Sequence, residues 1–300
     1  MKILISGASG LIGSSLAFAL DAAGHSLNRL VRDESRGAAG DVVWNPATGA
    51  IAASALAPFD AIVHLAGESI AAGRWTAEKK ERIRASRVHG TRVLAEALAK
   101  LPPRPRTLMS ASAIGFYGNR DDELLDESSS PGNDFLAEVC QSWEAAAEPA
   151  AKAGVRVVHP RFGVVLSGQG GALKKMLLPF RLGLGGRIGS GRQYMSWVAL
   201  DDVVGAIIHA LDAAALRGAV NVVAPNPVTN LEFTKTLGRV LSRPTIFPMP
   251  AVVARAAFGE MADALLLSSQ RVRPAKLQAA GYAFKFPTLA GALRHVLLPL

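Results

Sequence analysis

The chain begins with a short aliphatic run that leads directly into closely spaced glycines. Residues 3–6 are followed by Gly7, Gly10 and Gly13, and residues 16–20 then have the composition of a helix. In a strand, turn and helix of this kind, the first glycine permits a tight turn, the second lets a pyrophosphate approach the backbone, and the third lets the helix pack on the strand. The N-terminus of the helix favours the anion. We therefore expect a dinucleotide site made by Gly7, Ser9, Gly10, Leu11, Ile12 and Gly13.

The end of the next predicted strand indicates which dinucleotide is bound. A site for NAD usually has an acidic residue at this point, which binds the ribose 2′-hydroxyl. Here the strand at residues 27–31 ends at Val31 and is followed by Arg32. A guanidinium forms a bidentate pair with a 2′-phosphate, whereas an acid would repel it. Val31 and Arg32 therefore predict NADP(H), with Arg29 or Arg36 as further candidates; the alternative is that Arg32 lies on a solvated loop.

Composition bounds the class of protein. Half of the 300 residues are hydrophobic and 19% are charged, as in ordinary globular proteins with a large core. Cys140 is the only cysteine, so the chain forms no internal disulfide and suits a reducing compartment. The N-terminal strand is too short for a signal peptide, and no apolar run reaches the length of a membrane span. We expect a cytoplasmic protein without a membrane partner.

The net charge of +9 raises the question of nucleic acid. Basic residues are densest between Arg74 and Arg92, and a positive surface attracts phosphate polymers without reading their sequence. No zinc-ligand spacing, RNA-recognition motif or basic zipper accompanies the charge, and a phosphate-rich cofactor and substrate would also favour it. The sequence therefore predicts a small-molecule partner rather than nucleic acid. It predicts no metal site and gives no signal for the oligomeric state.

Strands and helices alternate through the first two thirds of the chain. Apolar runs at 61–65, 107–110 and 155–158 are separated by helical segments at 77–98 and 135–151. Such runs are typical of buried parallel strands joined by crossover helices. The sequence therefore predicts an α/β fold, with a Rossmann-type doubly wound parallel sheet.

A change in amino-acid composition after residue 163 predicts a second, smaller unit. Residues 183–191 are rich in glycine but also contain apolar side chains, which favours loops over a ligand rather than a linker. The last part of the chain has a mostly helical composition, which predicts a smaller C-terminal cap domain. We expect the dinucleotide-binding domain to span residues 1–165 and 195–225, and the substrate-binding cap to span residues 166–194 and 226–300.

Several motifs resemble those of the extended short-chain dehydrogenase/reductase superfamily, often called NAD-dependent epimerase/dehydratases. They are GASGLIG at 7–13, HLAG at 64–67, SASAIGFYG at 110–118 and GSGRQYMSWVALDDV at 189–203. More narrowly, the motifs LAGESI, RWTAEKK, SWE, GVVLSGQGGAL and GLGGRIGSGRQ resemble its atypical branch of YfcH- or SDR39U1-like epimerase family proteins. That branch carries a C-terminal domain of unknown function, which corresponds here to residues 249–297.

The resemblance implies where the rest of the cofactor would lie. Arg32 would bind the 2′-phosphate, and the ribose region would follow the strand that ends near residue 64. Arg87 stands where extended members usually carry an asparagine, so it would contact a phosphate or ribose, with Arg82 a turn earlier. The nicotinamide would lie beside Arg161 and the backbone near Val165. The implied cofactor residues beyond the glycine turn are Val31, Arg32, Leu65, Ala66, Gly67, Arg82, Arg87, Arg161 and Val165.

The expected catalytic centre departs from the superfamily pattern. The usual chemistry needs a tyrosine, a lysine four residues later, and a serine that hydrogen-bonds the substrate oxygen. Ser112 occupies the serine position, but the other two positions hold Phe135 and Val139, which cannot transfer a proton. Ser112 and Tyr117 are the candidate catalytic residues. The candidates for supplying a proton in place of the missing pair are Tyr117, Glu138, Cys140 and Glu144.

Two functions from different classes follow. The first is an NADP(H)-dependent oxidoreductase or epimerase acting on a polar substrate, with phosphorylated and nucleotide-linked compounds as candidates. The second is a sensor or interaction protein that holds NADP(H) without turnover, because the usual proton relay is missing. The expected substrate-binding residues are Glu68, Arg74, Trp75, Arg187, Arg192, Gln193 and Trp197, although the two tryptophans also suit a core position.

Overall fold

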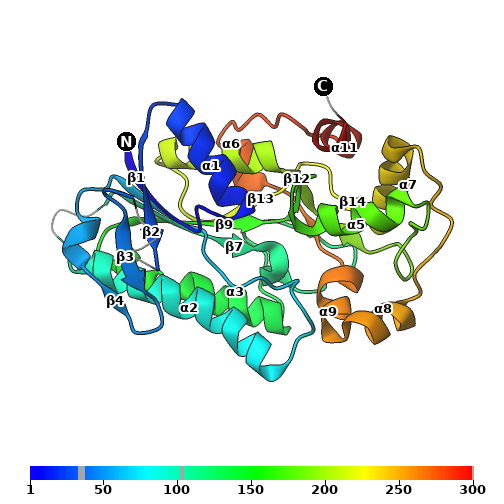
Figure 1. Ribbon diagram of the computed structural model, residues 1–300, viewed down its shortest axis with the longest axis horizontal. Coiled ribbons are helices and arrows are strands. Elements are labelled where there is room, and N and C mark those ends of the chain that lie inside the picture. Colours follow the sequence, from blue (N-terminus) through cyan, green and yellow to red (C-terminus); the bar gives the residue numbers. More distant parts are fainter. Residues whose placement is uncertain (33–37, 102–104, 299–300) are drawn as a thin grey trace.

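A largely parallel sheet forms the centre of the molecule, with helices on both faces (Figure 1). The computed structural model describes residues 1–32, 38–101 and 105–298. From edge to edge the strands are β13 (Gly218–Val222), β9 (Arg156–Phe162), β6 (Thr107–Ser110), β5 (Ala61–His64), β1 (Lys2–Ser6), β2 (Ser26–Val31), β3 (Val42–Asn45) and β4 (Ala50–Ile51). The pairs from β13 to β3 are parallel, and β4 is antiparallel to β3. The short β7 (Ser112–Ala113) also pairs with β9.

The strand order reverses beside β1, which has β2 on one side and β5 on the other. Their registers pair Ser6 with Leu30 and with His64, so the carboxyl ends of the three strands meet at one edge of the sheet. Ligands of open α/β sheets bind in the crevice at such a reversal. The predicted Rossmann-type doubly wound sheet is confirmed, and it places the glycine turn at this crevice.

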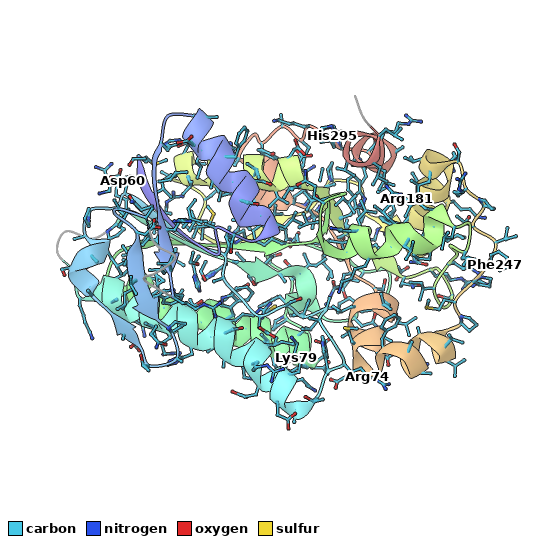
Figure 2. The ribbon with its side chains drawn as sticks, viewed as in Figure 1. Asp60, Arg74, Lys79, Arg181, Phe247 and His295 are labelled. Carbon is cyan, nitrogen blue, oxygen red and sulfur yellow. The ribbon has the colours of Figure 1, made fainter. Side chains whose placement is uncertain are left out.

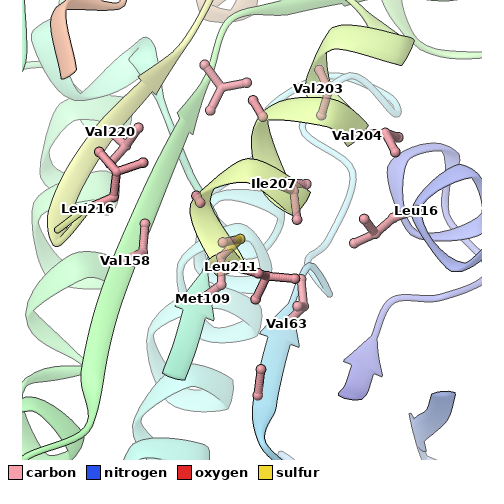
Figure 3. Close-up of a cluster of buried hydrophobic side chains, with 14 of the residues drawn as sticks. Leu16, Val63, Met109, Val158, Val203, Val204, Ile207, Leu211, Leu216 and Val220 are labelled. Carbon is pink, nitrogen blue, oxygen red and sulfur yellow. The ribbon is translucent and has the colours of Figure 1, made fainter. Parts of the chain in front are cut away.

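One face of the sheet is covered by α1 (Leu11–Ala22) and α6 (Leu200–Asp212). Leu16 of α1 and Ile207 of α6 belong to the same buried cluster as Val63 of β5 (Figure 3). Burying an aliphatic side chain of this size stabilises the fold by about 1.5–3 kcal/mol. The helix that begins at the glycine turn is therefore fixed on the sheet by its own apolar side chains.

The opposite face carries a second apolar cluster, which includes Leu94, Leu4 and Ile62. Leu94 belongs to the longest helix, whereas Leu4 and Ile62 lie on central strands. The helices on this side are α2 (Ala77–Ala99), α3 (Phe135–Ala145) and α4 (Glu148–Lys152). Since α2 follows β5 and α3 packs beside β7, both helices run close to the crevice.

A smaller unit built largely from the C-terminal part of the chain lies beside the sheet (Figure 1). Its core combines Leu173, Phe233 and Leu293 with Trp197. Its helices are α5 (Gly171–Arg181), α7 (Asn230–Leu241), α8 (Ala251–Phe258), α9 (Glu260–Ala262) and α11 (Leu289–Leu297). Short strand pairs support it: β10 (Val164–Leu166) with β12 (Trp197–Ala199), and β11 (Tyr194–Met195) with β14 (Val228–Thr229).

Part of the predicted cap range packs with the sheet instead of the smaller unit. Leu277 of α10 (Ala275–Ala279) is fully buried in the cluster that contains α1 and α6. The strand β15 (Arg271–Val272) pairs with β8 (Leu124–Leu125), which precedes α3 in the chain. The chain thus returns to the sheet before it ends at α11. Among the helices in the described ranges, none combines the length and hydrophobicity that crossing a membrane requires.

Candidate functional site

The turn after β1 leaves no room for side chains at two of its glycines. Gly7 has a φ of +72°, and a Cβ atom there would lie 2.9 Å from the amide nitrogen of Ala66. A Cβ atom on Gly13 would lie 2.2 Å from the carbonyl oxygen of Gly7. Gly10 donates its N–H to that same oxygen at 2.9 Å, which closes the turn. Only glycine at positions 7 and 13 lets α1 begin this close to β1 and β5.

The N-terminus of α1 is open to an anion. Gly10 is its N-cap, no side chain of the described residues caps it, and its first turn contains no acidic residue. The first N–H groups of a helix have no intrahelical partner and carry partial positive charge. Ser9 and Gly10 are exposed at this point. The turn and the helix end together fit the pyrophosphate of a dinucleotide, as the sequence predicted for Gly7 to Gly13.

Two buried side chains fix the other wall of the crevice. The Ser6 hydroxyl accepts hydrogen bonds from the N–H groups of Leu65 and Ala66, at 3.2 and 3.3 Å. It lies 2.6 Å from Nδ1 of His64, and it donates to that nitrogen because its oxygen already accepts the two amides. Ser6 and His64 are fully buried, and burial lowers the pKa of His64 to about 4. The edge of its ring meets Trp44, with centroids 5.7 Å apart.

The buried His64 predicts a loss of stability in mild acid. An unfolded chain protonates histidine near pH 6.5, whereas the folded chain protonates His64 only near pH 4, so the unfolded state takes up the proton first as the pH falls. Between pH 8 and pH 5 this group alone should reduce the free energy of unfolding by about 2 kcal/mol. Urea unfolding across that range measures the slope. His64→Leu should remove the part of the slope that His64 contributes and leave the part from His159, whose pKa burial also lowers, whereas the exposed His89→Gln should keep the whole slope; a slope that His64→Leu leaves unchanged contradicts the assignment.

Arg87 of α2 reaches the loop that follows β5. A Cβ atom on Gly67 would lie 3.4 Å from its guanidinium carbon. The guanidinium lies over the ring of Trp143 at 5.1 Å and donates to the carbonyl of Ile83. Burial lowers the pKa of Arg87, and the Glu68 carboxylate partly opposes this effect. The structure therefore brings Arg87 together with Gly67, whereas Arg82 is exposed on the same helix.

Glu68 continues this wall and is held by an ion pair. Its carboxylate lies 2.5 Å from Nζ of Lys79, whose side chain is buried, and its N–H donates to Ser86. The hydrogen bond from Lys79 holds the pKa of Glu68 below its ordinary value. Lys79, labelled in Figure 2, was not predicted as a site residue. A lysine one turn into a predicted helix gives no sequence signal that it will be buried.

Ser112 begins a chain of buried hydrogen bonds. Its hydroxyl donates to Oε1 of Glu144 at 2.7 Å. Arg161 donates to both oxygens of the same carboxylate at 2.8 Å, and its own side chain is 4% exposed. Burial alone would lower the pKa of Arg161, but the bonds and the charge of Glu144 raise it. Arg161 was expected beside the nicotinamide; the structure places its guanidinium on Glu144.

Tyr117 lies behind this network and does not reach an open surface. It is fully buried, donates to Oδ1 of Asn221 at 2.8 Å and accepts from Arg161 at 3.0 Å. Burial raises the pKa of its hydroxyl. Contact with a substrate would require the packing around it to open. Asn221, on β13, was not predicted, because an asparagine within an apolar strand does not by itself name its partner.

The remaining candidates for the missing proton donor are also occupied or buried. Glu138 points outward and pairs with Arg84. Cys140 is buried, and burial raises the pKa of its thiol to about 12. Phe135 stands at the tyrosine position, with its ring 5.4 Å from that of Trp75, and Val139 is buried. Of the groups considered at the sequence level, only Ser112 and Glu144 lie next to each other at the carboxyl end of the central strands.

Besides Glu68, two further expected substrate residues lie on the loop between β5 and α2. Arg74 donates to the carbonyl of Ala256 in α8, and so ties the loop to the smaller unit (Figure 2). Trp75 donates its indole N–H to the carbonyl of Ile70 at 2.8 Å. Both contacts are internal to the protein. The two hydrogen bonds fix the shape of the loop. A ligand could then contact only the faces of the Arg74 and Trp75 side chains.

The other expected substrate residues lie in the smaller unit. Arg187 donates to the carbonyl of Gly189 in its own loop, and Arg192 is exposed. Gln193 is buried and bridges two carbonyls, one of them that of Leu266. Trp197 is fully buried in the apolar core, the second of its two expected locations. Val165, expected beside the nicotinamide, pairs with Val198 in a short sheet.

A groove of about 580 Å³ lies beside Arg32, where β2 ends. Arg32 is exposed, as Arg29 also is, but Arg29 forms a 2.7 Å ion pair with Asp41. Arg36 lies outside the described residues. The groove is lined by Arg32, Val43, Trp44, Asn45, Ala50, Ile51 and Ala52. The residues from β3 and β4 were missed because the sequence analysis did not predict that hairpin. Across the described ranges, no group of three or more His, Cys, Asp and Glu side chains is arranged to hold a metal ion.

Comparison with known proteins identifies relatives over nearly the whole chain. Residues 3–223 match the NAD dependent epimerase/dehydratase family, and residues 249–296 match a domain of unknown function, DUF1731. An epimerase family protein of Mycobacterium tuberculosis is 47% identical over 293 residues, which cover 98% of this chain and 96% of that protein. The human epimerase family protein SDR39U1 is 38% identical, with 99% of each chain covered.

Solved structures agree with the sequence matches. The crystal structure of human SDR39U1 (isoform 2) with NADPH has a TM-score of 0.91 and 37% identity, and each chain is covered completely. A nucleoside-diphosphate sugar epimerase from Corynebacterium glutamicum has a TM-score of 0.82 and 38% identity over 99% of this chain and 58% of its own. These matches confirm the resemblance drawn from the motifs. The chain belongs to the NAD dependent epimerase/dehydratase family, within the group of epimerase family proteins that includes human SDR39U1.

Proposed function

We propose that this protein binds NADP(H) and transfers a hydride to or from a polar substrate, as an oxidoreductase or an epimerase. The observation that carries the proposal is the glycine turn, which leaves the N-terminus of α1 open to a pyrophosphate. The absence of an acid at Val31 and the presence of Arg32 support NADP(H) over NAD(H). The NADPH in the structure of human SDR39U1 supports the same choice.

The crevice residues would hold the cofactor in parts. N–H groups at the start of α1, from Leu11 and Ile12, would bind the pyrophosphate, and Arg32 would bind the 2′-phosphate. The loop from Leu65 to Gly67, with Arg87 behind it, would bind a ribose. When bound, the nicotinamide ring supplies or accepts a hydride. The buried neutral His64 keeps the loop in place without adding a charge of its own.

Ser112 would act on the oxygen of the substrate. Since its proton is directed to Glu144, its oxygen keeps lone pairs that can accept a hydrogen bond from a substrate hydroxyl. Arg161 fixes Glu144 from the other side. Phe135 and Val139 carry no proton that they could donate. A proton for a substrate alkoxide would therefore come from water or from another hydroxyl group of the substrate. Glu68, Arg74, Trp75 and Arg192 remain the proposed substrate contacts.

Replacing Arg32 with alanine tests the cofactor assignment. We expect NADPH affinity to fall about tenfold, because a charge-assisted pair with the 2′-phosphate is lost, and NADH affinity to stay unchanged. Isothermal titration calorimetry measures both constants. Arg294→Ala, which removes an exposed arginine of α11, is the control and should bind as the wild type does. Equal losses for both nucleotides, or no binding of either by the wild type, would contradict the proposal.

A second candidate is a sensor that holds NADP(H) without turnover. It is favoured by Phe135 and Val139 at the two positions where the proton relay is missing. Steady NADPH consumption with a sugar, aldehyde, ketone or quinone, lost in Ser112→Ala, supports the enzyme. Tight NADPH binding with no turnover across the same compounds supports the sensor. If the wild type and Ser112→Ala bind NADPH equally well, a difference in turnover between them is a difference in the chemical step and not in cofactor binding.

We propose a small polar molecule as the physiological partner and the cytoplasm as the location. The exposed polar groups that support a polar partner are Glu68, with 38% of its side chain exposed, Arg74 and Arg192. Cys140, the one cysteine, is a buried free thiol, and this state suits a reducing compartment. Activity that follows a small-molecule fraction of a cell extract, and not its nucleic acid, would support this assignment.

A further inference from the structure

Most of the net positive charge belongs to one fifth of the chain. Residues 166–194 and 226–255 contain nine Lys or Arg and one acidic residue, Glu232, an excess of eight in a chain whose total is +9. The nine are Lys174, Lys175, Arg181, Arg187, Arg192, Lys235, Arg239, Arg243 and Arg255. All nine side chains are exposed. The proposed active site does not account for this charge, because the basic residues of the cofactor crevice, Arg32 and Arg87, lie outside these two segments and Arg192 is the one of the nine proposed to contact substrate.

The same two segments expose large apolar side chains. Ile246 and Val252 are 68% and 71% exposed, values at which an aliphatic side chain stands almost free in water. Seven of them are Leu178 on α5, Leu182 and Leu184 just after it, Ile246 and Phe247 before α8, and Val252 and Val253 at its start; Leu231 of α7, 41% exposed, is an eighth. Single exposed apolar residues are ordinary, but a group of seven marks an interaction surface.

Hydrogen bonds to backbone carbonyls hold the two segments that carry these side chains next to each other. Arg243 donates to the carbonyl of Arg181 at 2.8 Å, and the N–H of Met249 donates to the carbonyl of Arg187 at 2.9 Å. The residues from 181 to 189 therefore run beside those from 243 to 249, and α8 begins directly afterwards. Figure 2 shows Phe247 at the end of the long axis of the molecule, with Arg181 on the same side. We call the seven apolar residues and the basic side chains of 174–192 and 235–255 the cap tip.

We infer that the cap tip docks on the surface of a bilayer that contains anionic lipids. Its side chains protrude from an end of the molecule, and two grooves of the described chain lie elsewhere: one is lined by residues of α2 and α3 together with Glu260, and the other by Arg32 and residues 43–45 and 50–52. Protruding aliphatic groups ringed by Lys and Arg match a bilayer, because the apolar groups enter the acyl boundary while the cations meet lipid phosphates. A protein partner would need a matching apolar pocket, and a single-stranded nucleic acid would favour several aromatic rings for stacking, whereas six of the seven apolar residues are aliphatic and only Phe247 is aromatic.

The inference revises the expectation that no membrane is involved. That expectation rested on the lack of a spanning segment, and a surface that lies on a bilayer requires none. The helix α5, which carries part of the cap tip, adjoins the loop that follows β5, because its Lys175 donates to the carbonyl of Ala71. The cap tip is separate from the glycine turn, so cofactor binding and docking can be measured independently.

Vesicle sedimentation tests the docking directly. The full chain is mixed with vesicles of phosphatidylcholine alone or of phosphatidylcholine with phosphatidylglycerol. We expect binding to the anionic vesicles only, reduced about tenfold by the double variant Ile246→Ser/Phe247→Ser, and reduced similarly by Lys174→Glu/Arg181→Glu. Phe18→Ser is the matched control, since Phe18 is 79% exposed on α1, far from the cap tip in the chain, and should bind as the wild type does.

Three results would overturn the inference. They are no binding to the anionic vesicles, equal binding to both kinds of vesicle, and anionic binding that Ile246→Ser/Phe247→Ser leaves unchanged. The last result would mean adsorption by charge alone. Thermal unfolding of each variant, expected to match the wild type because all substituted side chains are exposed, shows that a loss of binding is not a loss of fold. NADPH titration of the same variants should be unchanged, which separates this test from that of the proposed cofactor.

Discussion

Gly13→Ala is expected to weaken NADPH binding by about a hundredfold, which corresponds to roughly 2.7 kcal/mol of binding free energy. The added Cβ would lie 2.2 Å from the carbonyl oxygen of Gly7 and 2.9 Å from Cα of Ala8, and both are backbone atoms that no side-chain rotation can move. The start of α1 must therefore shift away from β1. The N–H groups that would bind the pyrophosphate shift with it, and backbone amides bind an anion well only when they all point to it.

Alanine substitutions at two other glycines serve as controls for Gly13→Ala. A Cβ on Gly10 has a single close contact, 3.2 Å from the Gly7 oxygen, so Gly10→Ala should weaken NADPH binding less than Gly13→Ala does. Gly291 lies in α11, where an added Cβ meets only the Thr288 hydroxyl at 3.1 Å, so Gly291→Ala should leave binding intact. Calorimetric titration gives the three constants, and circular dichroism reports the fold. Wild-type affinity in a folded Gly13→Ala protein would rule out the glycine turn as the cofactor site.

The parts of the fold that could be predicted are those that a short stretch of neighbouring residues specifies. The GxxGxxG turn after an aliphatic run specifies a strand, a turn and a helix, because only glycine satisfies the contacts at Gly7 and Gly13. The apolar runs at 61–65 and 107–110 become β5 and β6, since strands buried on both faces need apolar side chains at every position. The parallel sheet and the place of the crevice follow from these elements.

Two elements were predicted incompletely because their signals are weak. The helix expected over 135–151 is divided into α3 and α4, with Pro149 in the first turn of α4, where its missing N–H costs no hydrogen bond. The hairpin of β3 and β4 was missed. Its strands are short, and a few residues give little periodicity to read. The groove beside Arg32 depends on that hairpin, so its lining could not be predicted either.

The arrangement around Ser112 could be predicted only in part. The resemblance named Ser112, but the contact between Glu144 and Arg161 joins a helix to a strand that follows it in the chain. One signal was available: Arg161 lies in the same strand as the apolar Val157 and Val158, and burial of a guanidinium favours an anionic partner. The sequence does not say which of the carboxylates near residues 138–148 is that partner. Only the packing of α3 against β7 and β9 selects Glu144.

Arg161→Met is expected to reduce the free energy of unfolding by about 4 kcal/mol, because it leaves the Glu144 carboxylate buried without its counter-charge. The lost contacts are two hydrogen bonds to Glu144 at 2.8 Å and one to the Tyr117 hydroxyl at 3.0 Å, and the side chains of Arg161 and Glu144 are 4% and 15% exposed. The double variant Arg161→Met/Glu144→Leu should be destabilised by less than the sum of its single variants, because it removes both charges. Denaturation by urea measures all three free energies.

A surface pair of the same chemistry provides the control for this network. Arg255 and Asp263 lie 2.9 Å apart, but their side chains are 56% and 52% exposed, so Asp263→Asn should cost at most about 0.5 kcal/mol. If Arg161→Met reduces the free energy of unfolding by as little as Asp263→Asn does, or if the effects of the two single variants add exactly in the double variant, then water already screens Glu144. The catalytic consequence can be separated from stability. If Glu144 orients the Ser112 hydroxyl, Glu144→Gln should lose the Ser112-dependent turnover, because a neutral amide accepts the serine proton more weakly than a carboxylate does. The variant also leaves Arg161 without its counter-charge and should be destabilised, so turnover and NADPH affinity are compared under conditions where both proteins are folded.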